Sequence, residues 1–270
     1  MIGFVIPFKS RLKSKEWRLD CALLNRTIGS VLNQKSENFK CYVVYSDIPD
    51  NPVQHQKVQW IQFPFPFLES HQIEDEEKYV VRYGLGKNLP FFYDQGKKIM
   101  YGCSFAKKDG CRFIMSLDSD DLLSNKLVTF IENSNQPENC GWYINKGYRY
   151  VENKRLLIKT PKGMNYVCGS VNIVNSDLIP IPDFSKKTYN DFQFFSSHSY
   201  MEERMQLEHN KQLLPIPFYS LVYVIHTTNF MARKKDIEEI NVKNILKKII
   251  RGKLITTKVR TEFGIYKLAL

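Results

Sequence analysis

The sequence predicts an α/β fold with a mixed, mainly parallel β-sheet and helices on both of its faces. Two observations support this prediction. The first half of the chain alternates apolar, β-rich runs with segments of helical periodicity, which is typical of a parallel sheet covered by helices. The chain also has 270 residues, of which 43% are hydrophobic, so it can bury one substantial core.

Four strands and two helices are expected in the first half of the chain. The strands cover residues 2–8, 39–45, 58–63 and 113–117, and the helices cover residues 17–34 and 95–108. Turns that contain proline end the second and third strands. A further helix is expected to begin near Leu122, because Asp120 or Asp121 can cap it.

Three aspartates lie within four positions at the end of the fourth predicted strand. They are Asp118, Asp120 and Asp121, and Ser119 lies between the first two. Carboxylates this close repel one another, so they must be solvated, hydrogen-bonded or neutralised by a cation. A divalent metal, Mg²⁺ or Mn²⁺, would neutralise them and share its coordination with substrate phosphates. The alternative is a solvated turn in which Asp121 caps the following helix, and the sequence is compatible with both.

Other polar residues are expected at the same edge of the sheet. Lys9 and Arg11 follow the first strand, and Asp47 follows the second. In parallel sheets, ligands bind beyond the carboxyl ends of the strands. Cations for phosphate, an acid for a base or ribose, and carboxylates for a metal together predict a nucleotide-diphosphate site. Lys98, near the basic start of the helix at 95–108, is a further candidate for contacting the donor.

These motifs resemble those of GT-A fold glycosyltransferases, and most closely the large family 2 of inverting sugar-nucleotide transferases. The resemblance covers roughly residues 2–130 and rests on Val5-Ile6-Pro7-Phe8, Ser30-Val31-Leu32-Asn33-Gln34, Asp47 and Leu117-Asp118-Ser119-Asp120-Asp121. It implies a Rossmann-like GT-A fold and a hexosyltransferase. Such an enzyme moves a sugar from a nucleotide-diphosphate donor to a hydroxyl acceptor, with a metal and with inversion, in glycan or polysaccharide assembly.

The same resemblance implies roles for individual residues. It places Pro7 and Asp47 at the nucleobase, Asp118 at the ribose or the metal, and Asp120 at a divalent ion on the diphosphate. The chain departs from the family in the helix before the acidic motif, where Met100-Tyr101-Gly102 stands in place of Asn-x-Gly. This departure bears on the donor nucleotide rather than on the class of enzyme.

The second half of the chain is expected to supply the catalytic base and one more metal ligand. Ser197-His198 stands where family members carry Glu-Asp, and a neutral imidazole can accept the proton of the acceptor hydroxyl. His198 is therefore the first candidate for the base, followed by Asp191 and Glu202, although a capping or surface role for His198 also fits. His226 resembles the histidine that in this fold joins the metal or the diphosphate.

The acceptor side is expected to be aromatic. A predicted hairpin of residues 141–150 and 155–159 carries Trp142, Tyr143 and Tyr148, which either stack on a sugar ring or pack as part of a half-buried strand. The run at residues 167–174 resembles the family segment that passes beneath the donor sugar.

The predicted organisation is a catalytic domain followed by a tail. Residues 1–230 form the GT-A-like domain, in which 1–125 are the nucleotide-binding half and 126–230 are the acceptor half. Residues 231–270 form a basic amphipathic helical tail. The tail either packs on the domain or binds an anionic membrane through residues 233–260.

The net charge of +11 fits a nucleic acid, an anionic membrane or phosphorylated substrates. A nucleic-acid-binding protein is disfavoured because the cations concentrate in the tail and the carboxylates would repel phosphates. A nucleotidyltransferase, the other alternative, would be expected to carry a glycine-rich loop after the first strand, and Lys9-Ser10-Arg11 contains no glycine. The expected partners are a nucleotide-sugar donor and a glycan or lipid-linked acceptor.

Six cysteines without a Cys-x-x-Cys pair predict free, buried thiols rather than a zinc site. The apolar runs are shorter than a membrane span, and the first strand begins without a signal-peptide pattern. These features predict a cytoplasmic location, with peripheral contact at the inner face of the membrane as a further expectation.

Overall fold

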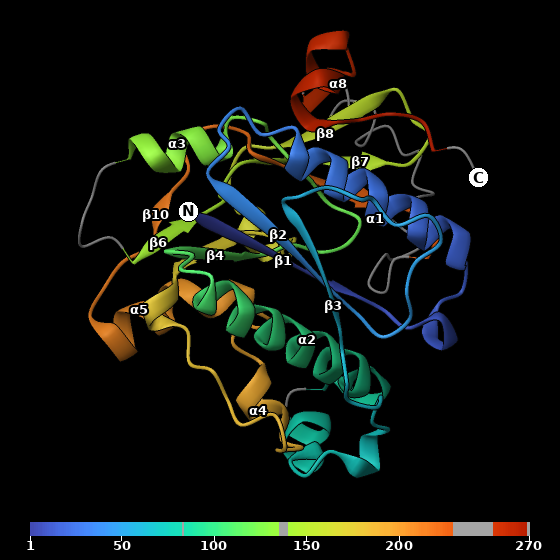
Figure 1. Cartoon of the computed structure of the whole chain (residues 1–270). Coiled ribbons are helices and arrows are strands. Elements are labelled where there is room, and N and C mark those ends of the chain that lie inside the picture. The colour runs from blue at the N-terminus through green and yellow to red at the C-terminus, as the bar shows by residue number, and fades with distance from the viewer. Residues whose placement is uncertain (83, 135–139, 229–250, 269–270) are drawn as a thin grey trace.

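The fold is described from a computed structural model, which defines residues 1–82, 84–134, 140–228 and 251–268. Its centre is a seven-stranded sheet of order β10-β6-β9-β4-β1-β2-β3 (Figure 1). Its strands are β1 (Ile2–Phe8), β2 (Phe39–Tyr45), β3 (Val58–Gln62), β4 (Phe113–Ser116), β6 (Gly141–Tyr143), β9 (Asn172–Asn175) and β10 (Leu214–Pro215). β9 runs antiparallel to both of its neighbours, and the other pairs are parallel. The sheet is therefore mixed and mainly parallel, as predicted.

Helices cover both faces of this sheet. The described α-helices are α1 (Trp17–Leu32), α2 (Leu89–Lys108), α3 (Leu127–Asn133), α4 (Tyr189–Phe192), α5 (Met201–His209) and α8 (Thr257–Phe263), of which α8 packs on the second sheet instead. Figure 1 shows α1 on one side of the sheet and α2 on the other. Alternation along β1 explains this arrangement, since Phe4 and Ile6 join the core that contains α1, whereas Val5 joins the core that contains α2. The predicted fold class is confirmed.

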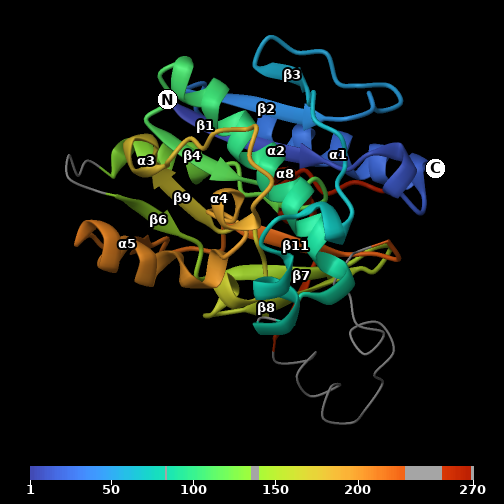
Figure 2. The same ribbon diagram turned by 90° about the horizontal axis from the view of Figure 1, so that it is seen from below.

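A second sheet of five strands, which the sequence did not predict, lies beside the first. Its order is β12-β8-β7-β11-β5, and its strands are β5 (Leu122–Leu123), β7 (Gly147–Val151), β8 (Leu156–Thr160), β11 (Leu221–Ile225) and β12 (Gly252–Leu254). Figure 2 shows β7, β8 and β11 together, apart from β1, β2 and β3. Leu19 and Leu23 of α1 and Phe263 of α8 share a core with this sheet. α1 is therefore packed between the two sheets.

Two local predictions are wrong. Residues Leu122–Leu123 form a strand that pairs with β11, so the expected helix at this point does not exist, and α3 begins only at Leu127. The expected hairpin is also divided, because β7 and β8 pair with each other whereas β6 belongs to the main sheet. In both places, pairing with strands from distant segments overrides the local pattern.

The described part of the tail adds a strand and a helix to the second sheet. β12 pairs antiparallel with β8. The buried side chain of Arg26 pairs with Glu152 at 2.6 Å and donates to the Tyr266 carbonyl at 3.1 Å, which ties the chain near Tyr266 to α1. Residues 229–250, which include most of the predicted membrane-binding segment, lie outside the described residues. Among the residues that the structure describes, no helix is both long and apolar enough to cross a bilayer. All six cysteines are free and buried, as predicted.

Candidate active site at the carboxyl edge of the sheet

The parallel strands end at one edge of the main sheet. Phe8 pairs with Tyr45, and Val5 pairs with Ser116, so the loops that follow β1, β2 and β4 leave the sheet on the same side. β9 is antiparallel, and the loop that precedes it therefore reaches this edge too. Four loops from distant parts of the sequence meet here, which is the expected ligand-binding position in a sheet of this kind.

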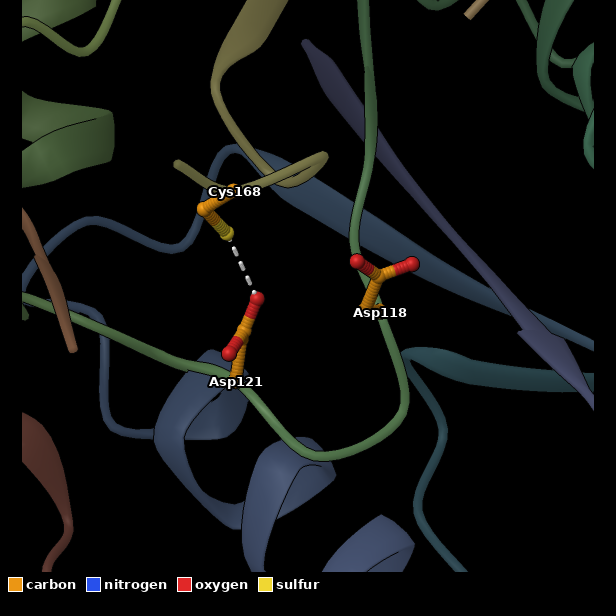
Figure 3. Close-up of side chains that lie close together, drawn as sticks. All are labelled: Asp118, Asp121 and Cys168. Atoms are coloured by element: carbon orange, nitrogen blue, oxygen red, sulfur yellow. Dashed lines mark hydrogen bonds between the residues drawn. The ribbon is translucent and has the colours of Figure 1, made fainter. Parts of the chain in front are cut away.

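Asp121 is a structural residue of this edge. Its side chain is fully buried and accepts hydrogen bonds from the Ser170 hydroxyl at 2.7 Å and the Val224 amide at 3.1 Å. It also accepts one from the Cys168 thiol at 2.9 Å (Figure 3). Burial raises the pKa of Asp121 well above its usual value, and the charges of Asp120 and Asp118 act in the same direction. The interpretation of Asp121 as a helix cap is wrong, because it joins three segments of the core instead.

Asp118 lies on the other side of the same turn. It accepts a hydrogen bond from the Gln95 amide at 2.8 Å, and its own backbone N–H donates to the Ser170 hydroxyl at 2.8 Å. Burial, with a contribution from the charge of Asp120, raises the pKa of Asp118 to about 7. The negative charge on this carboxyl is therefore poorly compensated, and a cation placed against it would stabilise the ionised form.

Asp120 contacts His226, which comes from the end of β11. The His226 Nε2 and the Asp120 Oδ2 lie 2.8 Å apart. The other ring nitrogen, Nδ1, accepts from the Thr228 amide at 3.3 Å, and the Thr228 hydroxyl donates to Asp20 at 3.1 Å. The two residues that the sequence predicted as metal ligands from opposite halves of the chain are thus in contact, and a network from α1 orients the imidazole.

The basic loop after β1 is held at this edge by acids. The Lys9 ammonium pairs with Asp20 at 3.1 Å, and the Arg11 backbone N–H donates to Asp47 at 2.8 Å. The Arg11 guanidinium reaches Asp50 at 3.4 Å. The structure thus brings Arg11 and Asp47 together at the edge where the sequence placed them.

Three other predicted donor residues have different environments. Pro7 is buried within β1, and Ser119 is half-buried in the acidic turn. The Lys98 side chain is 1% exposed and pairs with Asp94 at 2.7 Å, one helical turn before it in α2. This ion pair occupies the ammonium of Lys98.

His198 faces the acidic turn across Gly169. A Cβ atom built on Gly169 would lie 3.1 Å from the Asp118 Oδ2 and 3.9 Å from the His198 Nδ1, so both side chains border the same point. Burial lowers the pKa of His198, which keeps the imidazole neutral and able to accept a proton. The Asn172 amide donates to the His198 carbonyl at 3.0 Å and holds this turn against β9.

The two alternative bases differ from each other. Glu202, in the first turn of α5, accepts from the Asn165 amide at 3.1 Å, and burial raises its pKa. Asp191 accepts from the Thr188 hydroxyl and pairs with Lys186 at 3.0 Å. These contacts, with the Thr188 hydrogen bond as the largest cause, lower the pKa of Asp191 and weaken it as a proton acceptor.

One group of side chains at the acidic turn has donor atoms close enough together to hold a metal ion. Within the described residues, Asp118, Asp121 and Cys168 form a group whose ligand atoms all lie within 4.8 Å of one another. However, the pKa of the Cys168 thiol is raised well above its usual value by burial, so the thiol stays protonated, and Asp121 already accepts three hydrogen bonds. Mg²⁺ or Mn²⁺ prefers carboxylate oxygens, with an imidazole acceptable to Mn²⁺. Asp118, Asp120 and His226 do not form such a close group among the described residues, so their role as ligands of this ion stays a prediction.

Several residues of this edge could not be recognised from the sequence. Gln95 and Ser170 hydrogen-bond Asp118, and Thr228 and Asp20 orient His226. Each is an ordinary polar residue in its local context, and only the folded chain brings it to the site. For Ser170 alone, the neighbouring Gly169 signals a close approach of the backbone.

No protein-family model matches the sequence, and no curated protein matches it. Among solved structures, the chain is similar to S. aureus TarS 1–349, with a TM-score of 0.44 and 11% identity over 83% of this chain and 60% of that one. It is also similar to a putative nucleotide-diphospho-sugar transferase from Desulfovibrio desulfuricans G20, with a TM-score of 0.36 and 10% identity over 82% of this chain and 80% of that one. It is similar, too, to an active-site mutant of LgtC, with a TM-score of 0.37 and 10% identity over 96% of this chain and 99% of that one.

The chain spans 60% of TarS 1–349 and 36% of a second TarS structure.

Proposed function

We propose that this chain is a glycosyltransferase that moves a sugar from a nucleotide-diphosphate donor to a hydroxyl acceptor. One observation carries the proposal: Asp118 and His198 border the same point, at Gly169, on the carboxyl edge of the sheet. A group for the donor and a neutral base for the acceptor thus lie 3.1 Å and 3.9 Å from one point, the position of a Cβ atom built on Gly169. The donor nucleotide and the sugar are left open.

On the donor side, Asp118, Asp120 and His226 would hold a Mg²⁺ or Mn²⁺ ion. When bound, the ion neutralises charge on the diphosphate and so improves it as a leaving group. Lys9 and Arg11 follow β1 at the same edge and would add positive charge near the phosphates. Pro7, Asp47 and Ser119 would contact the nucleoside, and Lys98 would contact the donor after leaving Asp94.

On the acceptor side, His198 is the proposed base. Its imidazole takes the proton of the acceptor hydroxyl while that oxygen bonds to the anomeric carbon of the sugar. The bond between this carbon and the diphosphate oxygen breaks at the same time, and the electron pair leaves with the diphosphate. Attack from the face opposite the leaving group inverts the configuration. Glu202 is the second candidate because its pKa is raised, and Asp191 is the third.

The wider setting follows from the same proposal. The acceptor is a glycan or a lipid-linked glycan. The enzyme acts in the cytoplasm, and residues 233–260 of the basic tail contact anionic membrane at its inner face. Residues 1–230 form the catalytic domain, divided near residue 125 into donor and acceptor halves. No role in binding nucleic acid is proposed.

A thermal-shift screen tests the proposal. UDP, GDP, ADP, CDP and dTDP are each added with Mn²⁺, with Mg²⁺ or with EDTA, and the melting temperature is recorded. We expect one nucleotide to stabilise the chain only with metal, and Asp120→Ala to abolish this response. Asp177→Ala is the matched control, because Asp177 is an exposed aspartate beyond the far end of β9. Absence of any nucleotide response would count against a nucleotide-sugar transferase.

A further inference from the structure

Two tyrosines beside the candidate base are unusually exposed. Tyr166 is 71% exposed and Tyr200 is 65% exposed, and Val167, next to Tyr166, is 40% exposed. Tyr166 ends the short 3₁₀ helix η5 (Met164–Tyr166), and Tyr200 ends the short 3₁₀ helix η7 (His198–Tyr200). These two turns lie in contact with each other. The two exposed tyrosines therefore lie on neighbouring turns, one of which carries His198.

The backbone of these two turns is fixed from several directions. The Asn165 side chain donates to Glu202 at 3.1 Å, which joins η5 to α5. The Asn145 side chain accepts from the Gly163 amide at 2.7 Å at the start of η5. A hydrogen bond from Asn172 to the His198 carbonyl holds η7. Both tyrosines are thus presented on ordered turns, and little further ordering of the backbone is needed for a ligand to bind.

The aromatic residues that the sequence suggested for sugar stacking do not belong to these turns. Trp142 is 2% exposed and Tyr148 is 3% exposed, so both pack in the core and cannot reach a ligand. Tyr143 is half-buried and hydrogen-bonds Glu202. The exposed tyrosines of the two turns are Tyr166 and Tyr200 instead.

We propose that Tyr166 and Tyr200 bind a pyranose ring of the acceptor. This inference rests on the proposed glycosyltransferase function and specifies the acceptor of the same site. A pyranose has an apolar face of C–H groups and a rim of hydroxyls. Tyrosine offers a flat apolar ring with a polar tip and only two side-chain torsions to fix, which suits such a ligand.

The groups around the tyrosines also match a saccharide. Glu202 and His198 are hydrogen-bonding groups for a hydroxyl rim, and each lies within two positions of Tyr200 in the sequence. Gly169, which borders both Asp118 and His198, follows Tyr166 by three residues. A sugar ring placed on these tyrosines would therefore have hydroxyls close to the base and close to the donor side.

Saturation-transfer difference NMR tests the inference with defined probes. The probes are the methyl α- and β-glycosides of glucose, galactose, mannose and N-acetylglucosamine, together with the 1→4-linked disaccharides of glucose and N-acetylglucosamine. We expect at least one probe to receive saturation on its C–H protons. Tyr166→Ala and Tyr200→Ala should each weaken its binding by about tenfold, and the phenylalanine variants should retain most of it.

Leu207→Ala is the matched control. Leu207 is 77% exposed on α5, two helical turns beyond Tyr200, so it tests whether any exposed apolar residue of this helix matters. An unchanged affinity in Leu207→Ala supports a local sugar site. Equal losses in Leu207→Ala and Tyr200→Ala would overturn it in favour of an extended apolar partner, such as a lipid or a peptide.

The nucleotide thermal shift separates this inference from the function on which it rests. If the tyrosine variants keep the metal-dependent nucleotide response but no probe binds to the wild-type protein, the saccharide site is wrong and the transferase proposal stands. If no nucleotide binds but a glycoside does, the donor proposal is wrong, and the tyrosines form a saccharide-binding site of another kind. If the folded wild-type protein binds neither a nucleotide nor a glycoside, both the transferase proposal and the saccharide site are wrong.

Discussion

The donor and acceptor sides of the candidate site differ in the charge state of their polar side chains. On the donor side opposite charges are paired, as in Lys9 with Asp20 at 3.1 Å and Arg11 with Asp50 at 3.4 Å. On the acceptor side burial favours neutral groups, since it lowers the pKa of His198 and raises that of Glu202. A highly charged diphosphate suits the first environment, whereas proton transfer from a neutral hydroxyl suits the second.

Replacement of His198 should give the largest effect and should be confined to the acceptor side. His198→Gln keeps a polar side chain but removes the proton acceptor, so kcat should fall by about 10²–10⁴-fold with unchanged nucleotide affinity. The measurements are steady-state kinetics and nucleotide titration. Glu202→Gln and Asp191→Asn are the controls. If either of them lowers kcat more than His198→Gln does, the role of base passes to that residue.

Removal of Asp121 should act on the fold and not on either substrate. Asp121→Ala leaves the Ser170, Cys168 and Val224 donors without their acceptor, and unfolding in urea should show a loss of about 3 kcal/mol. Asp121→Asn, which keeps an acceptor oxygen, should lose less. If the Asp121→Ala protein is stable but fails to bind metal, Asp121 is a metal ligand. The proposed division between a structural Asp121 and the metal-binding Asp118 and Asp120 would then be wrong.

Asp120→Asn should affect only the donor side. Loss of one carboxylate ligand should weaken Mn²⁺ binding by about 10–100-fold, which titration followed by electron paramagnetic resonance can measure. Saccharide binding at Tyr166 and Tyr200 should be unchanged. If Mn²⁺ binds Asp120→Asn as tightly as it binds the wild-type protein, the proposed metal ligands are wrong.

The smallest of these effects should be the change in stability and in kcat/KM with pH that the titration of His198 causes. Because burial lowers the pKa of His198, the unfolded chain takes up its proton at a higher pH than the folded chain does. The contribution to stability is therefore complete above about pH 6.5 and falls as the pH drops towards the folded pKa. The acidic limb of kcat/KM should likewise lie below pH 6.5, and His198→Gln should remove the corresponding slope in stability. An acidic limb above pH 6.5 would contradict the buried, neutral imidazole.

The sequence predicted the main sheet well because its signals are local. The apolar runs at residues 2–8 and 39–45 became β1 and β2 with the expected bounds, and parallel pairing then brought Arg11 to Asp47. The contact of Asp120 with His226 had been suggested only by the family resemblance. The structure brings these residues together, whereas their roles remain predictions for the experiments above.

The environment of Asp121 could not be predicted in the same way. Its three donors come from residues 168, 170 and 224, which are far from it in the sequence, so nothing in the local pattern separates a buried acceptor from a helix cap. The second sheet was missed for a similar reason. β5 has only two residues and forms through its pairing with β11. Such short segments follow their tertiary partners more than their own propensity.

Gly169 has a practical consequence for protein engineering. The φ angle of Gly169 is not positive, so the backbone does not require glycine here. Glycine matters at this position because it has no side chain to contact Asp118. A single methyl group there would lie 3.1 Å from the Asp118 carboxylate, where the neighbour must shift slightly to admit it. Gly169→Ala thus adds the smallest possible steric obstacle at this point. A donor analogue that lacks one substituent would leave room for the added methyl group. In a mixture of transferases, such an analogue would bind the Gly169→Ala variant selectively.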